Sequence, residues 1–498
     1  MKKVILKNIF SGLLSQFITI IYGFIVPILI IKEYGSSANG LVSSIAQFIA
    51  YINLLQLGIG PVIKKSLFEP IAKNDKEKIS DILCASNLFF RRIAYFLVVY
   101  IVILCIVFPF VNNEFSSVYS ISLIIIISFG TFFEYFLGMT YKLFLTSDQK
   151  NYVVDYINIF GYVISLILIY VLIKTNNSIQ TVKLVGALIF LIKPLLMKKY
   201  FDKHYNIKIN KNTNYSFKDK WSGFAHHIAA TIQGNTDVVV LTIFSNLTNV
   251  SIYAMYNLIV TSINNIIVSL TNGIDGFFGK SLVKNESSIN DNFNLYNFFF
   301  YTIMVILIGC TLVLITPFIG VYTSNIQDAD YIKWSFGYVL VLAEFNYAIR
   351  YPYATLVYSK GHFKQTTKYA IIEPIVNIIV SIILVSKYGL IGVAIGTLIS
   401  MPIRSFGFIY HAIKHILNES FIRHFKVILL SYIELYIIFL LRYKLLFFET
   451  NSYLQWALLA FIIFVIISIS VLLINSIIIR PNLGFNKLFK RKRGFDEK

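Results

Sequence analysis

Long apolar runs separated by short polar segments dominate the pattern along this chain. A helix that crosses the hydrocarbon core of a bilayer needs about 20 predominantly apolar residues. The pattern therefore predicts an all-α integral membrane protein with about 14 transmembrane helices joined by short loops. The runs of sufficient length lie approximately at 9–31, 40–63, 84–110, 118–143, 152–173, 180–197, 222–244, 249–273, 293–320, 331–358, 369–386, 390–415, 425–446 and 453–478.

The composition of the 498-residue chain agrees with this prediction. Hydrophobic residues make up 57% of it and charged residues 14%, whereas soluble proteins carry about 25% charged residues. The three cysteines, Cys84, Cys105 and Cys310, lie in or beside apolar runs without CxxC spacing. We therefore expect small buried thiols and no disulfide framework.

The net charge of +20 would suit a nucleic-acid partner if the basic residues formed one patch. Instead, one alternate set of loops, which includes both termini, holds 32 of the 44 Lys and Arg, while the opposite set holds five basic and five acidic residues. Short loops rich in Lys and Arg mark the cytoplasmic side, so we predict that both termini are cytoplasmic. The scattered charges exclude nucleic acid, and the basic tail, 487–498, is expected to meet anionic lipids.

Motifs for soluble catalysis are absent from the sequence. It contains no GxxxxGK[ST], HExxH or GxSxG segment, and its short loops leave no room for an extramembrane domain. We therefore predict a transporter, with no catalytic residue, no metal site and no cofactor. An H+ or Na+ gradient, the membrane potential or the substrate's own gradient would supply the energy.

An internal repeat is indicated by short echoes at a nearly constant offset. "SGLLSQF" from Ser11 matches "SGFAHHI" from Ser222, 211 positions later, and "EYFLGMTYKLFL" from Glu134 matches "EFNYAIRYPYATL" from Glu344 at an offset of 210. Two parallel repeats follow from such an offset. The predicted parts are an N-terminal lobe at 1–200, a basic linker at 201–221, a C-terminal lobe at 222–415, an extra helix pair at 416–480 and a basic tail at 481–498.

Several segments, in order along nearly the whole chain, resemble Wzx-type polysaccharide flippases. The first is "YGSSANGLVSSIAQFIAYINLLQLGIG" (Tyr34–Gly60), which is followed by the basic "KKSLFEPIAKNDKEKIS". "TSDQKNYV" (Thr146–Val153), "NVSIYAMYNLI" (Asn249–Ile259) and the segment from Val357 to Arg404 continue the resemblance.

This resemblance implies the multidrug/oligosaccharidyl-lipid/polysaccharide exporter fold, in which two six-helix lobes face a central cavity. It also implies that the protein moves undecaprenyl-diphosphate-linked oligosaccharides across the bacterial plasma membrane for capsule, O-antigen or exopolysaccharide assembly. A polysaccharide polymerase and glycosyltransferases would be its partners.

Three other functions remain open from the sequence. A multidrug antiporter of the same superfamily would place acids and aromatics in the cavity, and a peptidoglycan-precursor flippase is a nearer relative. A membrane polymerase or glycosyltransferase would need a large extracytoplasmic loop, and the longest outer loop, 442–452, is too short for one.

Intramembrane arginines are the first candidates for binding a diphosphate. A cation at the bilayer centre costs at least about 2.5 kcal/mol, and Arg suits bidentate phosphate binding. Arg350 and Arg404 lie deepest, each roughly 13 Å from the cytoplasmic end of its span at 1.5 Å per residue. The alternatives are a structural pair with Glu344 or Glu373 and a snorkelling side chain. Arg91 and Arg92 precede an apolar run that can span by itself, so they are either interfacial anchors or the cavity's cytoplasmic mouth.

The remaining candidates are acids, aromatics and one lysine in the spans. Glu134 and Glu344, at repeat-related positions, together with Asp237 and Glu373, are candidates for the cavity or for ion coupling, against structural ion pairs or hydrogen bonds. Lys193 is expected to snorkel to the inner interface. Tyr347 and Tyr351 flank Arg350 at helical spacing and are candidate sugar contacts, and Pro352 and Pro402 predict bends beside Arg350 and Arg404. The acidic and aromatic candidates are Glu134, Glu344, Asp237, Glu373, Tyr347 and Tyr351.

Overall fold

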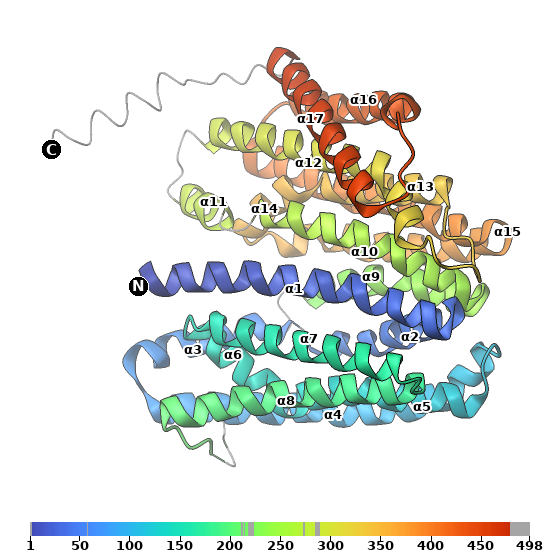
Figure 1. The fold of residues 1–498 in the computed structure, drawn as a ribbon. Helices are drawn as coiled ribbons and strands as arrows, with labels where there is room; N and C mark the ends of the chain where they lie inside the picture. The colour runs from blue at the N-terminus through green and yellow to red at the C-terminus, as the bar shows by residue number, and fades with distance from the viewer. Residues whose placement is uncertain are drawn as a thin grey trace. The chain divides into compact units, whose positions relative to one another are not determined.

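The computed structural model describes residues 2–56, 58–210, 213, 215–217, 224–271, 274–283 and 289–478. Every regular element in this part of the chain is helical, which confirms the predicted all-α membrane fold (Figure 1). The predicted tail at 481–498 and part of the predicted linker (211–212, 214 and 218–221) lie outside the described residues.

The helices account for all fourteen predicted spans. Eleven helices in the described part are long and apolar enough to cross a membrane, one of which, α15, contains two spans. The other two spans are the less apolar α9 and the interrupted pair α13–α14. The helices that form the spans are α1 (Lys2–Tyr34), α2 with η1 (Ser36–Ala50 and Tyr51–Gln56), α4 (Lys76–Val111), α5 with η2 and α6 (Ser117–Phe133, Glu134–Gly138 and Met139–Ser147), α7 (Asn151–Lys174), α8 (Ile179–Tyr205), α9 (Phe224–Phe244), α10 (Leu247–Ser269), α12 (Ile289–Tyr322), α13 (Trp334–Ala348) with α14 (Tyr351–Ser359), α15 (Phe363–Ala412) with η3 (Ile413–Leu417), α16 (Phe421–Leu445) and α17 (Tyr453–Ile478).

The chain forms two compact units. Unit 1 consists of Met1–Leu258, Asn325–Ala329 and Ser381–Val393, and unit 2 contains the rest of the chain. The predicted lobes differ from these units mainly in that α9 and the first part of α10 group with unit 1.

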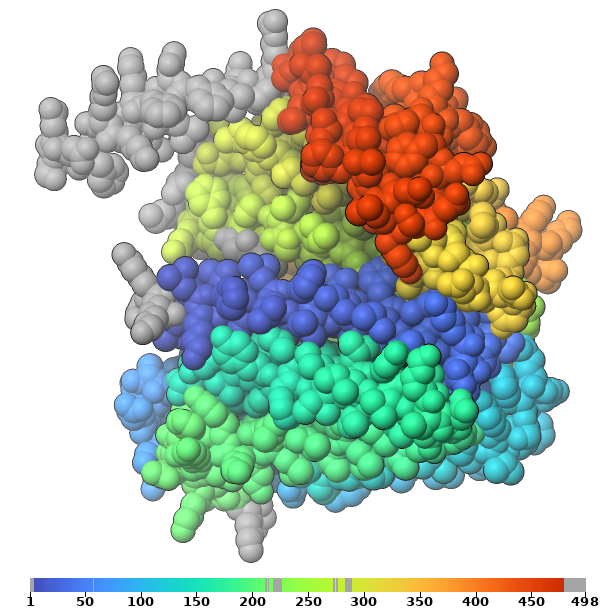
Figure 2. All heavy atoms as spheres, in the orientation of Figure 1, coloured from blue at the N-terminus to red at the C-terminus, as the bar shows by residue number. Residues whose placement is uncertain are grey.

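Unit 1 is a helical bundle in which α7 packs against both α1 and α8 (Figure 2). Its core is aliphatic and aromatic, with Leu41, Leu83, Leu97 and Phe144 almost fully buried. The outer face of α4, in contrast, exposes large apolar side chains. A continuous exposed apolar surface is what lipid requires, because the hydrocarbon solvates it in place of water. The exposed residues of this face include Phe96, Val99, Val102, Ile103, Ile106 and Phe110.

Unit 2 is built around α12, the most enclosed of the spanning helices. The extra pair α16–α17 packs on α12. A Cβ added at Gly309 would lie 2.7 Å from Ile438 Cδ1, so the absence of a side chain at Gly309 lets α12 and α16 approach closely. Asn475 Nδ2 donates to Thr302 Oγ1 across 3.2 Å. The extra pair is therefore an integral part of unit 2.

The two repeats show the same irregularities at an offset of about 210 residues. In the fourth span, the π-helical turn η2 separates α5 from α6; in the tenth span, α13 ends at Ala348 and α14 begins at Tyr351. Two short helices absent from the predicted spans, α3 (Ile59–Lys73) and α11 (Ile274–Val283), pack against α6 and α14 respectively. Shared breaks and shared packing support a duplicated unit.

Glycine and proline have different effects on the helices α13 to α15. The two spans of α15 meet at Gly389, whose φ of +53° suits a residue without a side chain. The tenth span is interrupted beside Arg350, where α13 ends at Ala348 and α14 begins at Tyr351, just before Pro352. At Pro402 the helix continues without interruption past Arg404 to Ala412.

Candidate functional site

A buried ion triad joins the two deepest arginines to one glutamate. Arg350 Nη1 lies 3.0 Å from Glu373 Oε1, and Arg404 Nη1 lies 3.2 Å from Glu373 Oε2. The exposed fractions of the Arg350, Glu373 and Arg404 side chains are 4%, 0% and 5%. Each carboxylate oxygen therefore serves one guanidinium, deep inside unit 2.

The helix breaks explain how three distant residues meet. Arg350 caps the start of α14, where Pro352 needs no backbone N–H partner. Glu373 lies on the first half of α15 and Arg404 on the second, and the turn at Gly389 returns the second half alongside the first. Asn377 Nδ2 donates to Thr397 Oγ1 across 2.9 Å, which joins the two halves near the triad.

Glu373 is the ion-pair partner of both Arg350 and Arg404. Of the structural pairs expected as an alternative to a cavity role, the pair with Glu373 forms and the pair with Glu344 does not. The Arg350 guanidinium also lies over the Tyr347 ring, 3.6 Å from its centroid. Two cations share one anion, so the triad carries a formal charge of +1 where charge is expensive to bury.

The other predicted acids have three different environments. Glu344 is buried beside Val260 and Ile308, and no ion pair joins it to any described residue. The Glu134 carboxylate lies 3.1 Å from Lys142 Nζ and is half-exposed. Asp237 is buried in unit 1, where it accepts a 2.8 Å hydrogen bond from Tyr253. Of the four acids, only Glu373 forms ion pairs with Arg350 and Arg404.

The remaining predicted site residues belong to both units: Arg91 and Arg92 to unit 1 and Tyr351 to unit 2. Arg91 and Arg92 are exposed on α4, and the Arg91 guanidinium lies 5.0 Å from the Phe136 ring centroid. Tyr351 donates a 2.8 Å hydrogen bond to Asn264 Oδ1. The structure thus gives Tyr351 a partner within unit 2.

Lys193 does not snorkel, contrary to the sequence expectation. Its side chain is buried inside unit 1, with Nζ 4.0 Å from the Tyr162 ring centroid and 3.8 Å from that of Phe190. Counting residues to the end of the span could not reveal the two aromatic rings that hold the ammonium in place, Tyr162 on the neighbouring α7 and Phe190 on α8 itself.

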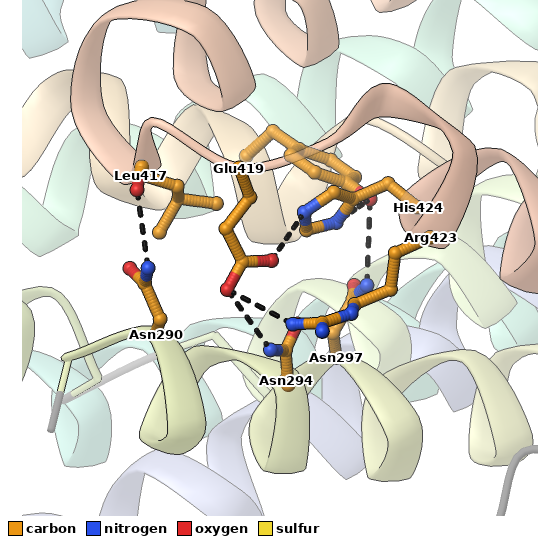
Figure 3. A network of polar contacts seen from close by, with 8 residues as sticks. Asn290, Asn294, Asn297, Leu417, Glu419, Arg423 and His424 are labelled. Atoms are coloured by element: carbon orange, nitrogen blue, oxygen red, sulfur yellow. Dashed lines mark hydrogen bonds and ion pairs between the residues drawn. The ribbon is translucent and has the colours of Figure 1, made fainter.

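A polar network at the base of α16 was not predicted (Figure 3). His424 is buried; its Nε2 lies 3.1 Å from Glu419 Oε2 and its Nδ1 lies 3.2 Å from the Tyr353 hydroxyl. Arg423 and Asn294 donate to the other Glu419 oxygen. The network ties α12, α14 and α16 together within unit 2.

A signal for this network exists in the sequence but is weak. Glu419 stands in a short loop and His424 five residues later at the start of an apolar run. Periodicity cannot tell a satisfied interior histidine from an interfacial one, and the partner Tyr353 lies 71 positions away.

A second histidine contact lies where α14 connects to α15. His362 Nδ1 is 2.9 Å from His411 Nε2. Desolvation first, and the nearby Lys360 and His415 charges second, lower the pKa of His362 from its ordinary 6.5. No group of three His, Cys, Asp or Glu side chains in the described part of the chain has the geometry to hold a metal ion.

A polar seam joins α2 to α9 and α10 at one end of unit 1. A Cβ at Gly40 would clash with the Leu247 carbonyl, so the backbones touch there. Small hydroxyl and amide side chains of the facing helices bond directly, which allows close approach of the helices. The bonded pairs are Ser37–Thr248 at 3.0 Å, Asn39–Ser251 at 2.8 Å and Ser44–Thr242 at 2.7 Å.

Comparison with solved structures identifies transporters with the same fold. No family profile matches the chain, and no characterised protein matches it by sequence. The lipid II flippase MurJ, in an inward closed conformation, superposes with a TM-score of 0.68 at 17% identity, over 93% of this chain and 98% of MurJ. An inward-facing multidrug resistance MATE family transporter gives 0.62 at 13% identity, over 80% of this chain and 94% of that one.

A MOP superfamily transporter from Pyrococcus furiosus, described by the reverse polarity of its binding pocket, gives a TM-score of 0.55 at 13% identity, over 84% of this chain and 97% of that one. At these identities the likeness establishes the fold and no substrate. This multi-pass membrane protein has the fold of the MOP superfamily transporters.

Proposed function

We propose that the protein is a flippase for undecaprenyl-diphosphate-linked oligosaccharides of the bacterial plasma membrane, with both termini in the cytoplasm. The observation that carries the proposal is the likeness to MurJ, a lipid-linked-substrate flippase, over 93% of this chain. The unmatched 7% is shorter than the segment Phe421–Ile478, so the match extends into the extra helix pair. The superposition with the MATE family transporter covers only 80% of this chain.

The polar seam supports transport by alternating access. The pairs between α2 and α9–α10 hold one end of unit 1 together through three neutral hydrogen bonds. Such bonds contribute about 1 kcal/mol each, because water replaces them when they open. The equilibrium between the closed and the open seam therefore involves only a few kcal/mol, and a substrate that binds one of the two states more tightly can shift it. In the proposed cycle this end opens after the headgroup has entered from the opposite side.

The cationic side chains supply the proposed contacts for the diphosphate. Arg91 and Arg92 are exposed and available in the present state. Arg350 and Arg404 bind the diphosphate only in a state that uncovers them, because Glu373 now occupies both guanidiniums. Coupling to H+, Na+ or the membrane potential would involve Glu344, which is buried without an ion pair among the described residues. Tyr347 and Tyr351 are the proposed sugar contacts.

Gene deletion tests the proposed function against drug export. Loss of surface polysaccharide with unchanged drug susceptibility is the expected result. Altered susceptibility with intact polysaccharide would replace the proposal with the multidrug antiporter. At normal protein level, Arg350→Lys and Arg404→Lys should reduce polysaccharide, whereas Arg423→Lys, at an exposed arginine, should not.

The MurJ likeness favours a second candidate, a peptidoglycan lipid-precursor flippase. Expression of the chain in cells depleted of their own lipid II flippase distinguishes the two. Rescue of growth would establish the second candidate, and failure to rescue, with the protein present in the membrane, would favour the oligosaccharide substrate.

A further inference from the structure

A cavity of about 550 Å³ lies inside the helical bundle of unit 1. Its size falls within the range of about 300–1,000 Å³ typical of small-molecule sites. The π-helical turn η2 forms part of its wall, and π-turns occur frequently at functional sites. The lining includes Tyr22, Glu134, Lys142, Tyr162, Lys183 and Lys193.

Lys193 is the buried cation of this cavity. Its exposed fraction is 8%, and its ammonium lies over the rings of Tyr162 and Phe190, 4.0 and 3.8 Å from their centroids. Among the described residues, no carboxylate lies within 4 Å of its ammonium. A Cβ at Gly161 would clash with Lys193 Cε, so the glycine makes room for the lysine side chain along α7.

Comparison of the two repeats shows that Lys193 has no carboxylate where its counterpart in unit 2 has one. Lys193 and Arg404 are 211 positions apart, as are Tyr162 and Glu373, and 211 is one of the offsets that relate the repeats. In unit 2 the cation meets a carboxylate at 3.2 Å. In unit 1 the corresponding cation meets a tyrosine ring. The protein therefore supplies the anion in one repeat and leaves an aromatic face and a cavity in the other.

The charges around the cavity favour an anion. Three lysines line it, Lys142, Lys183 and Lys193, against one acid, Glu134, whose carboxylate is already paired with Lys142 at 3.1 Å. A cation inside a membrane bundle is costly unless an anion pairs with it. The two aromatic faces contribute only about 0.5–2 kcal/mol of cation–π attraction each. A bound anion would provide the missing compensation.

We propose that this cavity is a binding site for an anionic phosphate group, with the Lys193 ammonium as its central contact and Lys183 and Lys142 as outer cations. Lipid headgroups and free phosphate share this chemistry. The site stands independently of the proposed flippase function, because it lies wholly within unit 1 and apart from the Arg350–Glu373–Arg404 triad.

Calorimetric titration of the full-length protein in a neutral maltoside detergent tests the site. The probes are dihexanoyl phosphatidic acid, inorganic phosphate and, as the phosphate-free control, dihexanoylglycerol. Saturable binding of phosphatidic acid alone assigns the site to a lipid headgroup. Equal binding of inorganic phosphate assigns it to the free anion. Absence of binding by both phosphate probes, or equal binding of dihexanoylglycerol, overturns the proposal.

Three variants locate the binding. Lys193→Met should weaken it at least about tenfold, the equivalent of 1.4 kcal/mol, while Lys174→Met, at an exposed lysine near a Tyr170 ring on α7, should leave it within about twofold. Gly161→Ala keeps every charge but displaces the lysine, and should also weaken binding. Wild-type affinity in Lys193→Met overturns the proposal. If Lys193→Met does not fold, Gly161→Ala decides by the same criterion.

Discussion

Removing the negative charge of the triad with Glu373→Gln should strongly destabilise unit 2. The substitution keeps the shape of the side chain but only one acceptor oxygen, because the amide NH2 that replaces the other oxygen is a donor and cannot accept from a guanidinium. It removes the carboxylate charge that pairs with Arg350 and Arg404, whose side chains are only 4% and 5% exposed. The perturbation removes one charge and one hydrogen-bond acceptor at a single buried site.

The expected loss of stability follows from the two distances between the arginines and Glu373. At an effective dielectric constant of about 20, ion pairs at 3.0 and 3.2 Å each contribute roughly 5 kcal/mol of attraction. Most of this attraction is offset by the desolvation of the ions, and the measured cost of removing one partner of a buried pair is about 3–5 kcal/mol. Arg404→Met removes one attraction and one buried cation together, so its cost should be only about 0–2 kcal/mol.

Thermal unfolding in detergent, followed with a thiol-reactive dye, measures both variants. The native thiols Cys84, Cys105 and Cys310 are buried or half-buried and become reactive on unfolding, and Cys310 lies in α12 of unit 2. At about 2–4 °C per kcal/mol, the melting temperature should fall by about 6–20 °C for Glu373→Gln. Glu134→Gln, at an exposed ion pair, is the matched control and should cost no more than about 1 kcal/mol.

The melting temperatures of Glu373→Gln and Arg404→Met, compared with each other, test whether the three residues act as a triad. If Glu373→Gln melted like the wild type, the carboxylate would not compensate two buried cations. If Arg404→Met were the more damaging, the site would be better described as two independent pairs than as a triad with an excess cation.

Three further outcomes follow from the described contacts. In a cysteine-free background, the double variant Ser37→Cys/Thr248→Cys should form a disulfide on oxidation, because the native hydroxyls are 3.0 Å apart. The disulfide should stop transport and its reduction should restore it; transport by the oxidised protein would show that the seam does not separate. Tyr353→Phe removes the hydroxyl that contacts His424 Nδ1 and should cost about 1–3 kcal/mol in thermal unfolding, so an unchanged melting temperature would contradict that role. The pKa of His362 is lowered on folding, so the unfolded chain binds more protons and stability should fall as the pH drops below about 6.5. His362→Gln should flatten this part of the melting curve against pH, and an unaltered slope would contradict the assignment.

The spans were predictable because a single physical requirement determines them. About 20 apolar residues are needed per crossing, and fourteen runs meet that requirement. The short helices α3 and α11 were not predicted, since their apolar residues merge with the end of the preceding span or stand among polar residues. The π-turn at Glu134 is a local change of hydrogen-bond register that leaves no mark in the hydrophobic pattern.

The triad was only half predictable. Depth in the span identified Arg350 and Arg404 as unusual, because buried charge is costly, and Glu373 was predicted only as one possible partner or cavity residue. That both arginines share one carboxylate depends on the turn at Gly389, which sets the register of the two halves of α15. For Lys193 the same depth argument failed, because the ammonium rests on aromatic rings and the sequence gives no partner for it.

Reconstitution into liposomes tests the proposed flippase function directly. The purified protein is inserted into liposomes that contain a fluorescent undecaprenyl-diphosphate-linked oligosaccharide in both leaflets. A membrane-impermeant glycosidase added outside reports how much of the lipid reaches the outer leaflet. If the protein is a flippase, nearly all of the labelled lipid should become accessible to the enzyme, whereas protein-free liposomes should leave the lipid of the inner leaflet protected. Inner-leaflet lipid that stays protected in the presence of folded protein would exclude the proposed flippase function.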